Sequence, residues 1–340
     1  MPLSLKDVSQ VQRALVRWFR QYQRDLPWRR TKDPYRILVS EIMLQQTQVD
    51  RVIPKYRAFL RRFPIVQALA RATPRDILLA WAGMGYNRRA LYLRRAAQEI
   101  VAQYGGTVPT DPALLQTLPG VGAYTAAAVA TFATGIPRAL ADTNVRRVIG
   151  RIFLGAPHGK WRESRLRQMV ERATPRQPVS GVHPSLWGHA LMDFGALVCK
   201  ATPRCAVCPV RQWCKAYPQI QRDNAQKRLR RANRGSRGFL RFASTMSGRG
   251  EHGRGNRSGS HPRIPDRIYR GRILQALRER DPAPVSLLEL AVLLCEVSRP
   301  RLHRLVRGLA AEGLLTLSSG QHAQLPRGET VQGSARREGA

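Results

Sequence analysis

Apolar residues recur every three or four positions through most of the first 222 residues of the chain. This spacing gathers them on one face of an α-helix. Prolines and glycines separate the periodic stretches, and no run in this region alternates between apolar and polar residues as a strand would. The pattern predicts an all-α region over residues 1–222. Its expected helical stretches are residues 11–22, 36–46, 75–84, 90–104, 124–135, 145–155, 165–175 and 185–200.

The pattern changes after this region. Residues 222–263 contain twelve Arg or Lys residues and two acidic ones, with frequent Gly and Ser and little apolar periodicity. Such a composition is typical of a flexible tether. We therefore predict a flexible basic linker over residues 223–263, which either touches DNA phosphates or serves as a plain solvated connection.

Helical periodicity returns near the C-terminus. Ser298 is expected to be the N-cap of the last predicted helix, just before Pro300. The stretch "LLTLSSGQHAQLP" after it predicts a two-stranded hairpin. Three helices and a hairpin indicate a winged-helix domain over residues 264–325, followed by a disordered tail at residues 326–340. The three helices are expected at residues 266–280, 286–297 and 298–313.

Composition narrows the setting of the protein. The chain has 340 residues, of which 43% are hydrophobic, enough for two or three domains. No apolar run approaches the roughly 18 residues that a membrane span requires. The N-terminus also lacks the apolar core of a signal peptide. We therefore expect a soluble cytoplasmic protein, associated with the nucleoid if it is bacterial.

Charge is the outlying property of the sequence. The chain has 58 Lys and Arg residues against 22 Asp and Glu, a formal net charge of +36. A polyanionic partner follows from this excess, and nucleic acid is the first candidate. A basic ribosome-associated protein, or a protein that is merely very soluble, has the same signature, so charge alone does not decide between them.

Four of the five cysteines share the stretch "CKATPRCAVCPVRQWC". Disulfides are rare in cytosolic proteins, so Cys199, Cys205, Cys208 and Cys214 are predicted metal ligands, either for zinc or for a [4Fe–4S] cluster. Zinc ribbons usually contain two C-x2-C pairs and this stretch has one, which favours the cluster, in a structural rather than an electron-transfer role. Cys295 lies in an apolar run and is expected to be a buried core thiol.

The sequence "LPGVG" separates two helical stretches. Its glycines permit a tight turn and leave room for a phosphate against the backbone. The next helix is expected to begin near Tyr124, where unpaired N–H groups attract anions. An ordinary interhelical turn is the alternative. The basic composition favours a DNA phosphate site at Leu118, Gly120, Val121 and Gly122.

Two carboxylates are candidates for chemistry. On a helix, Glu41 lies one turn after Ile37 and one turn before Gln45, which directs it inward or into a cleft. A surface glutamate is the alternative. Asp142 precedes a basic helix, where an N-cap role competes with stabilisation of a cationic transition state. Paired carboxylates are the usual apparatus for breaking glycosidic bonds.

Together these pieces resemble a known family. "LPWR", "SEIMLQQTQV", "LPGVGAYTAAAV", "LADTNVRRV" and "MDFGALVC" followed by the cysteine loop are similar to the helix-hairpin-helix DNA glycosylases, over about residues 12–217. The glutamine stretch resembles the adenine DNA glycosylase branch. The resemblance implies an all-α fold with a six-helix barrel and an iron–sulfur subdomain, DNA bound across the cleft between them, and flipping of the target base out of the duplex.

The resemblance also implies roles for individual residues. Glu41 resembles the acid that protonates the purine, and Asp142 the carboxylate that stabilises the oxocarbenium-like sugar, with Asn144 as its polar neighbour. The residues expected to contact DNA near the vacated position or the opposing base are Gln45, Gln46, Thr47 and Tyr86.

Tyr124 carries a prediction about the product. Bifunctional relatives have a lysine at this position, whose amine forms a Schiff base that leads to strand cleavage. Tyrosine cannot do this. The resemblance therefore implies a monofunctional glycosylase that leaves an abasic site.

The sequence departs from the family in three places. The first cysteine gap has five residues where six are common. Asn87 replaces a second tyrosine of the adenine branch. The C-terminal region lacks the strand-rich Nudix-like domain that reads 8-oxoguanine, which leaves recognition of that base open.

Three functions stay in competition at this point. The leading hypothesis is excision of adenine mispaired with guanine or 8-oxoguanine, by a monomer acting on double-stranded DNA. A thymine or uracil mismatch glycosylase is the second, because "YTAAAV" also suits that branch. A non-enzymatic iron–sulfur DNA-binding regulator is the third, and the presence of both Glu41 and Asp142 disfavours it.

Overall fold

The structure is a computed structural model, and it describes residues 5–159, 161–181, 183–226, 264–318 and 321–327. Contacts divide the chain into two compact units. Unit 1 comprises Met1–Asp25 and Thr134–Ser260, and unit 2 comprises Leu26–Ala133 and His261–Ala340. Each unit is therefore assembled from segments that are far apart in the sequence. In the part of the chain that the structure describes, no helix is long and apolar enough to cross a membrane.

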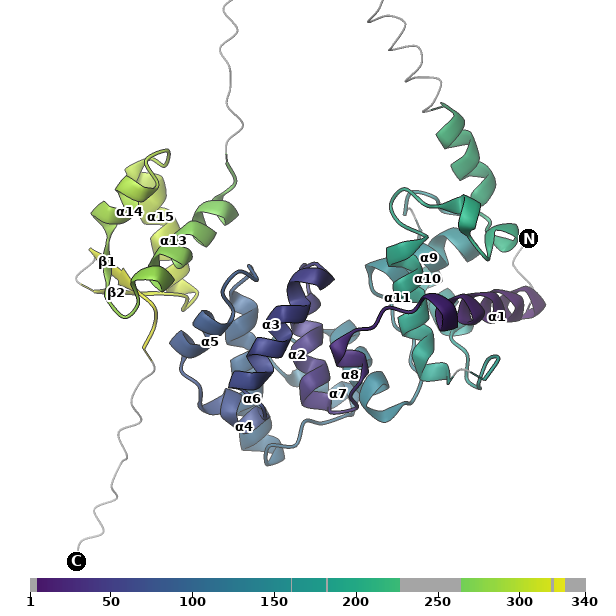
Figure 1. Cartoon of the computed structure of the whole chain (residues 1–340), viewed down its shortest axis with the longest axis horizontal. Helices are drawn as coiled ribbons and strands as arrows, with labels where there is room; N and C mark the ends of the chain where they lie inside the picture. Colours follow the sequence, from purple (N-terminus) through teal and green to yellow (C-terminus); the bar gives the residue numbers. More distant parts are fainter. Residues whose placement is uncertain (1–4, 160, 182, 227–263, 319–320, 328–340) are drawn as a thin grey trace, which may run out of the picture. The chain divides into compact units, whose positions relative to one another are not determined.

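The central part of unit 2 is a set of short helices around one hydrophobic core. Large residues such as Phe59 and Trp81 are fully buried in that core. Helix α4 packs along α6 (Figure 1). These helices are α2 (Pro34–Leu44), α3 (Val49–Arg62), α4 (Val66–Arg71), α5 (Pro74–Ala80), α6 (Arg88–Tyr104), α7 (Pro112–Thr117) and α8 (Ala123–Thr134).

Unit 1 joins the N-terminal helix to later helices. Its core contains Leu15 and Phe194, and Asp193 is fully buried, with its carboxylate bound to Arg24 at 2.7 Å. This ion pair fixes the end of α1 against α11. The helices of the unit are α1 (Leu5–Tyr22), α9 (Thr143–Leu154), α10 (Glu163–Ala173) and α11 (Trp187–Leu197), and residues 217–226 are also helical.

The C-terminal part of unit 2 has the element order of a winged helix. Its strands form an antiparallel sheet in the order β1-β3-β2, with Val285 opposite Ala323. The sequence predicted two strands, and the short strand β1 makes a third. The elements are α13 (Asp266–Arg280), β1 (Val285–Ser286), α14 (Leu287–Leu293), α15 (Arg299–Ala311), β2 (Thr316–Ser318) and β3 (His322–Gln324).

This C-terminal part packs directly on the central helices of unit 2. Leu78 of α5 and Leu91 of α6 belong to the same buried cluster as Leu274 and Leu277 of α13. Arg75 forms an ion pair with Asp281 at the end of α13. The winged helix is thus integrated into unit 2.

Two expectations from the sequence differ from what the structure shows. Cys295 is exposed, so the prediction of a buried core thiol is wrong; helix α14 ends at Leu293, and Cys295 lies in the following turn. The predicted linker begins inside a helix, because residues 223–226 are helical, and its remaining residues, 227–263, lie outside the described part. The predicted tail likewise lies outside it from residue 328 on.

Candidate active site and nucleic-acid interface

Glu41 lies on a central helix of unit 2. Asp33 caps this helix by accepting a hydrogen bond from the backbone N–H of Tyr35, and Pro34 occupies its first turn. Of the 11 residues of α2, 8 are buried, and Glu41 is one of them, with 7% of its surface exposed. A carboxyl in such a setting is rare unless it has a task, because burial of its charge is costly.

Helix α2 ends at Leu44, one residue short of Gln45. The helical extrapolation that placed Gln45 one turn above Glu41 is therefore wrong in its geometry. Gln45 has a non-helical backbone, and its Nε2 donates a hydrogen bond of 3.5 Å to Oγ1 of Thr125 on α8. The glutamine thus connects the end of α2 with the helix that follows the glycine hairpin.

Two of the predicted DNA-contacting residues have left-handed backbones. Gln46 has φ 57° and Tyr86 has φ 46°. Residues other than Gly, Asn and Asp rarely adopt this conformation, and it is concentrated at functional positions. Both side chains are exposed, Tyr86 to 55%. An exposed aromatic ring on a strained turn is well suited to enter a base stack.

Arg89 holds both of these turns in place. Its side chain is 9% exposed, and it was not identified from the sequence because an arginine in "YNRRA" resembles any surface arginine. Burial lowers its pKa to about 10, so it stays cationic at neutral pH. Its guanidinium donates hydrogen bonds to the carbonyl oxygens of Ile42, Met43, Gln45, Met84, Gly85 and Tyr86 and to Oγ1 of Thr47.

The glycine hairpin forms between α7 and α8, as the sequence predicted. Gly120 has φ 78°, and a Cβ there would lie 2.9 Å from Cβ of Tyr92. Leu118 and Val121 are buried, so neither side chain faces solvent. Gly122 has open space where a Cβ would stand. The hairpin therefore presents backbone atoms and an accessible glycine just before the N-terminus of α8, where helix N–H groups attract anions.

Tyr124 lies in the first turn of α8 and is half-buried. Thr125, its neighbour, accepts the hydrogen bond from Gln45. A phenol replaces the amine that a Schiff base requires. Position 124 therefore has no side-chain amine that could form a Schiff base.

Asp142 is the N-cap of α9 in unit 1. Its Oδ1 accepts a hydrogen bond of 2.6 Å from the backbone N–H of Val145, and its Oδ2 accepts one of 3.0 Å from Nδ2 of Asn144. Burial raises the pKa of the Asp142 carboxyl, and these hydrogen bonds only partly offset the effect. The capping and functional interpretations agree, because capping fixes the orientation of the carboxylate.

Arg147 holds Asn144 in turn, and Gly195 leaves room for it. Arg147 donates from Nη2 to Oδ1 of Asn144 at 2.7 Å and from Nε to the backbone oxygen of Cys199 at 2.8 Å. A Cβ on Gly195 would lie 2.6 Å from that of Asn144, so glycine permits the close approach of α11 to α9. Neither Arg147 nor Gly195 was singled out from the sequence, since only the fold brings them to Asn144.

The four predicted cysteine ligands line one cavity in unit 1. Without a metal, burial raises the pKa of Cys208 to about 12 and that of Cys214 to about 11. Arg151 connects the loop to α9: its Nη1 lies 3.6 Å from Sγ of Cys199, and its backbone oxygen accepts a hydrogen bond from Cys214. Among the described residues, no three His, Cys, Asp or Glu side chains converge on a single ion position.

Comparison with known proteins places these features in a family. Residues 39–172 match the model of the HhH-GPD superfamily of base excision DNA repair proteins. An adenine DNA glycosylase of Mycolicibacterium smegmatis is 36% identical over 322 residues, which cover 93% of this chain and 96% of that protein. The adenine DNA glycosylase of Homo sapiens is 37% identical over 232 residues, 64% of this chain. The matched part spans 42% of the human protein.

Other members of the superfamily are similar over the same region. A thymine/uracil-DNA glycosylase of Pyrobaculum aerophilum is 34% identical over 220 residues, covering 64% of this chain and 95% of that protein. The solved structure of a thermostable thymine-DNA glycosylase has a TM-score of 0.57 at 30% identity, covering 63% of this chain and 98% of its own. A non-covalent endonuclease III–DNA complex has a TM-score of 0.56 at 21% identity, covering 65% and 99%, and supports the fold alone.

Proposed function

The chain belongs to the HhH-GPD superfamily of base excision DNA repair proteins and within it to the adenine DNA glycosylases, and from this premise we propose that it removes adenine mispaired with guanine or 8-oxoguanine in double-stranded DNA. The observation that carries the proposal is Glu41, a carboxyl buried in an apolar helix directly before the "QQT" turn. A protein that only binds DNA has no need of a buried acid there.

Glu41 acts as the general acid in this proposal. When the bond between C1′ of the deoxyribose and the purine nitrogen breaks, the bonding electrons leave with the base. A proton donated by Glu41 neutralises the developing negative charge on the purine. General acids of this kind contribute roughly 10²–10⁴-fold to a rate.

Asp142 acts on the sugar. Loss of the base leaves an oxocarbenium-like cation at C1′, and an ionised Asp142 stabilises that charge until a water adds there and gives its proton to the carboxylate that Glu41 has become. Its two hydrogen bonds, from Val145 and Asn144, hold the carboxylate in one orientation throughout. Preorganised groups of this sort avoid reorganisation at the moment of reaction.

The product in this proposal is an abasic site in an intact strand. Tyr124 stands where an attacking lysine would be needed for strand cleavage.

The protein acts as a monomer. The backbone of the hairpin between α7 and α8 binds a DNA phosphate.

We also propose that Cys199, Cys205, Cys208 and Cys214 hold a [4Fe–4S] cluster. In such a cluster each thiolate binds a different iron, so the four sulfurs do not need to meet at one point. That requirement agrees with cysteines that line a common cavity without converging on one ion position. The cluster would keep the loop folded against α9. Iron analysis with roughly four irons per chain would support this, and stoichiometric zinc would contradict it.

A single-turnover excision assay tests the function. Duplexes with A:8-oxoG, A:G, T:G and U:G pairs are incubated with the protein and then treated with alkali to reveal abasic sites. Adenine release from the first two is expected, with strand nicks only after alkali. Glu41→Gln and Asp142→Asn should each lower the rate by roughly 10²–10⁴-fold while the protein still binds DNA.

Two outcomes would contradict the assignment. Absence of adenine release from both adenine duplexes removes the proposed substrate, and release of thymine or uracil instead would favour the second candidate. That candidate is supported by the thymine-DNA glycosylase likeness at 30% identity. Efficient nicking without alkali would contradict the monofunctional reaction.

A further inference from the structure

Unit 2 contains a groove of about 580 Å³ that the assigned functions do not yet use. One wall comes from the turns that carry Gln46 and Tyr86, together with the start of α6, and the other from helix α13 and the end of α15. Residues of the winged helix therefore face those predicted to read the DNA. The lining residues that bear on its chemistry are Gln46, Tyr86, Arg88, Arg267, Arg270 and Glu312.

The groove carries a positive charge. Three arginines available to a ligand, Arg88, Arg267 and Arg270, line it against a single carboxylate, that of Glu312. A fourth, Arg89, adds its charge, but its guanidinium binds the carbonyl groups of the two turns. Arg270 pairs with this carboxylate at 2.6 Å, and Arg88 lies at 4.0 Å from it. Arg267 is exposed and forms no ion pair with another described residue. The surplus of guanidinium groups matches phosphodiester oxygens, which arginine binds in a planar, bidentate manner.

Helix α13 is anchored at its far end. Arg278 donates from Nε to the backbone oxygen of Leu78 at 3.1 Å and from Nη2 to Oδ1 of Asn87 at 2.7 Å. Arg75 binds Asp281 with an Nε–Oδ1 distance of 2.8 Å. Asn87 stands where the adenine branch has a second tyrosine, and its side-chain oxygen accepts the hydrogen bond from Arg278 of α13. The anchor holds the groove arginines in fixed relation to the Tyr86 turn.

We propose that this groove binds the sugar–phosphate backbone of the strand opposite the excised base, with Arg267 and Arg270 contacting its phosphates. Tyr86, which is predicted to wedge beside the opposing base, lies in the same lining as Gln46, which is predicted to enter the duplex near the vacated position. The backbone of the opposing nucleotide therefore continues along α13. Arg270 exchanges Glu312 for a phosphate on binding. The identity of the strand rests on the proposed function, whereas phosphate binding by the groove does not.

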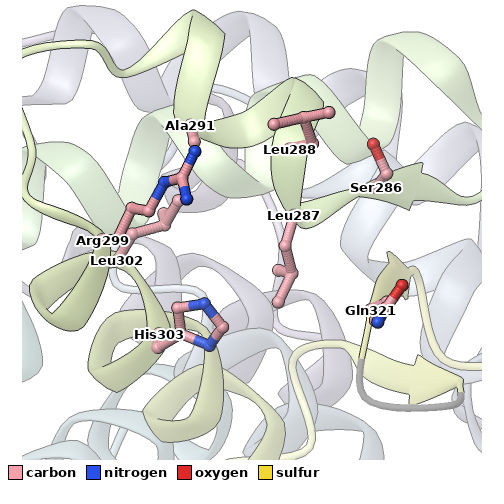
Figure 2. A pocket seen from close by; sticks show the side chains of 8 residues that line it. All are labelled: Ser286, Leu287, Leu288, Ala291, Arg299, Leu302, His303 and Gln321. Carbon is pink, nitrogen blue, oxygen red and sulfur yellow. The ribbon is translucent and has the colours of Figure 1, made fainter.

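A second cavity, in the winged helix, is the alternative surface for DNA binding. It has a volume of about 320 Å³ and lies between α14 and the first turns of α15. Figure 2 shows Arg299 and His303 on α15 lining it across from Leu287. Helix-turn-helix relatives insert the corresponding helix into the major groove of DNA. Arg299 is exposed like Arg267, so the two arginines form a matched pair for a test.

The experiment measures how DNA affinity depends on salt. The full-length protein binds a fluorescent A:8-oxoG duplex whose adenosine carries a 2′-fluorine that blocks excision. Each phosphate contact contributes roughly 0.9 to the slope of log K against log salt. Arg267→Ala and Arg270→Ala should each reduce the slope by roughly one, and Arg299→Ala should leave it unchanged. Arg267→Gln, which keeps a long polar side chain, should behave like Arg267→Ala.

Neutral methylphosphonates, placed one at a time, then identify the strand. At one position in the strand opposite adenine, a methylphosphonate should weaken DNA binding by the unmodified protein. The same methylphosphonate should not weaken binding by the Arg267→Ala variant any further. Unchanged salt slopes for the α13 variants would overturn the proposal. It would also be overturned if the methylphosphonate whose effect disappears in Arg267→Ala were found only in the adenine strand. If the unmodified protein releases adenine in these cases, the proposed function stands and only this inference fails.

Discussion

Arg147 donates one hydrogen bond to the backbone oxygen of Cys199 and another to the side chain of Asn144, at 2.8 and 2.7 Å. Asn144 in turn donates to Asp142 at 3.0 Å. One guanidinium therefore connects the first cysteine of the predicted cluster loop with the carboxylate that is proposed to act on the sugar. A loop that was expected to be only a structural staple is thus connected to the orientation of the Asp142 carboxylate.

Replacement of Arg147 by alanine should slow excision without abolishing the fold. The change removes the restraint on Asn144 and leaves the Cys199 oxygen unpaired, a loss of about 1–2 kcal/mol that corresponds to roughly 5–30-fold in rate if it falls on the transition state. Single-turnover excision and iron content are the measurements. Arg146→Ala is the matched control, because Arg146 pairs with exposed Glu163. Equal rates for the two variants would contradict the role of Arg147.

The pH dependence of excision should respond to Asn144. Burial raises the pKa of Asp142, and the hydrogen bond from Asn144 counteracts part of that rise. In the proposed reaction the ionised carboxylate is the active form, so the rate should fall as pH drops through this raised pKa. Asn144→Ala removes the stabilising hydrogen bond, the pKa rises further, and the acidic limb of the single-turnover pH profile should move to higher pH. A profile that falls uniformly without moving would show that Asn144 acts in another way.

Arg89 should be needed for the arrangement of both DNA-facing turns. Arg89→Ala leaves several buried carbonyl groups without a donor, at a cost of about 1–3 kcal/mol for each one that water cannot reach. We expect a clearly lower melting temperature and weaker DNA binding. Arg89→Lys keeps the charge but cannot span the two turns, so it should retain the fold better than it retains binding. Arg95→Ala, on the exposed side of α6, is the control and should change neither quantity.

Substitution of the two hairpin glycines should affect different properties, thermal stability at Gly120 and DNA binding at Gly122. Gly120→Ala forces a left-handed alanine against Tyr92, so its melting temperature should fall. Gly122→Ala meets open space and should fold normally, yet its methyl group stands where a phosphate is expected to approach. Thermal melts combined with DNA titrations distinguish the two effects. Full DNA affinity in Gly122→Ala would remove Gly122 from the phosphate site.

The sequence alone identified most of the helices, the hairpin and the cysteine loop, but it missed α3, α4 and α7. Helical periodicity and the punctuation by proline and glycine are local properties, so they are readable without a fold. Asp142 was recognised as a cap because a cap is defined by the residues next to it. Glu41 was identified by residue type and by resemblance, and its 7% exposure agrees with an inward-facing acid.

Only the tertiary structure decided how these pieces are held. Arg278 and Asn87 are 191 positions apart, and no local pattern links them. The left-handed turns at Gln46 and Tyr86 persist because Arg89 binds the carbonyl groups around both. Local periodicity also placed Cys295 wrongly in the core, because it extended the helix beyond Leu293, whereas Cys295 lies in the turn that follows α14. Contacts between distant segments depend on packing of the whole unit, and the spacing of residues along one segment does not encode them.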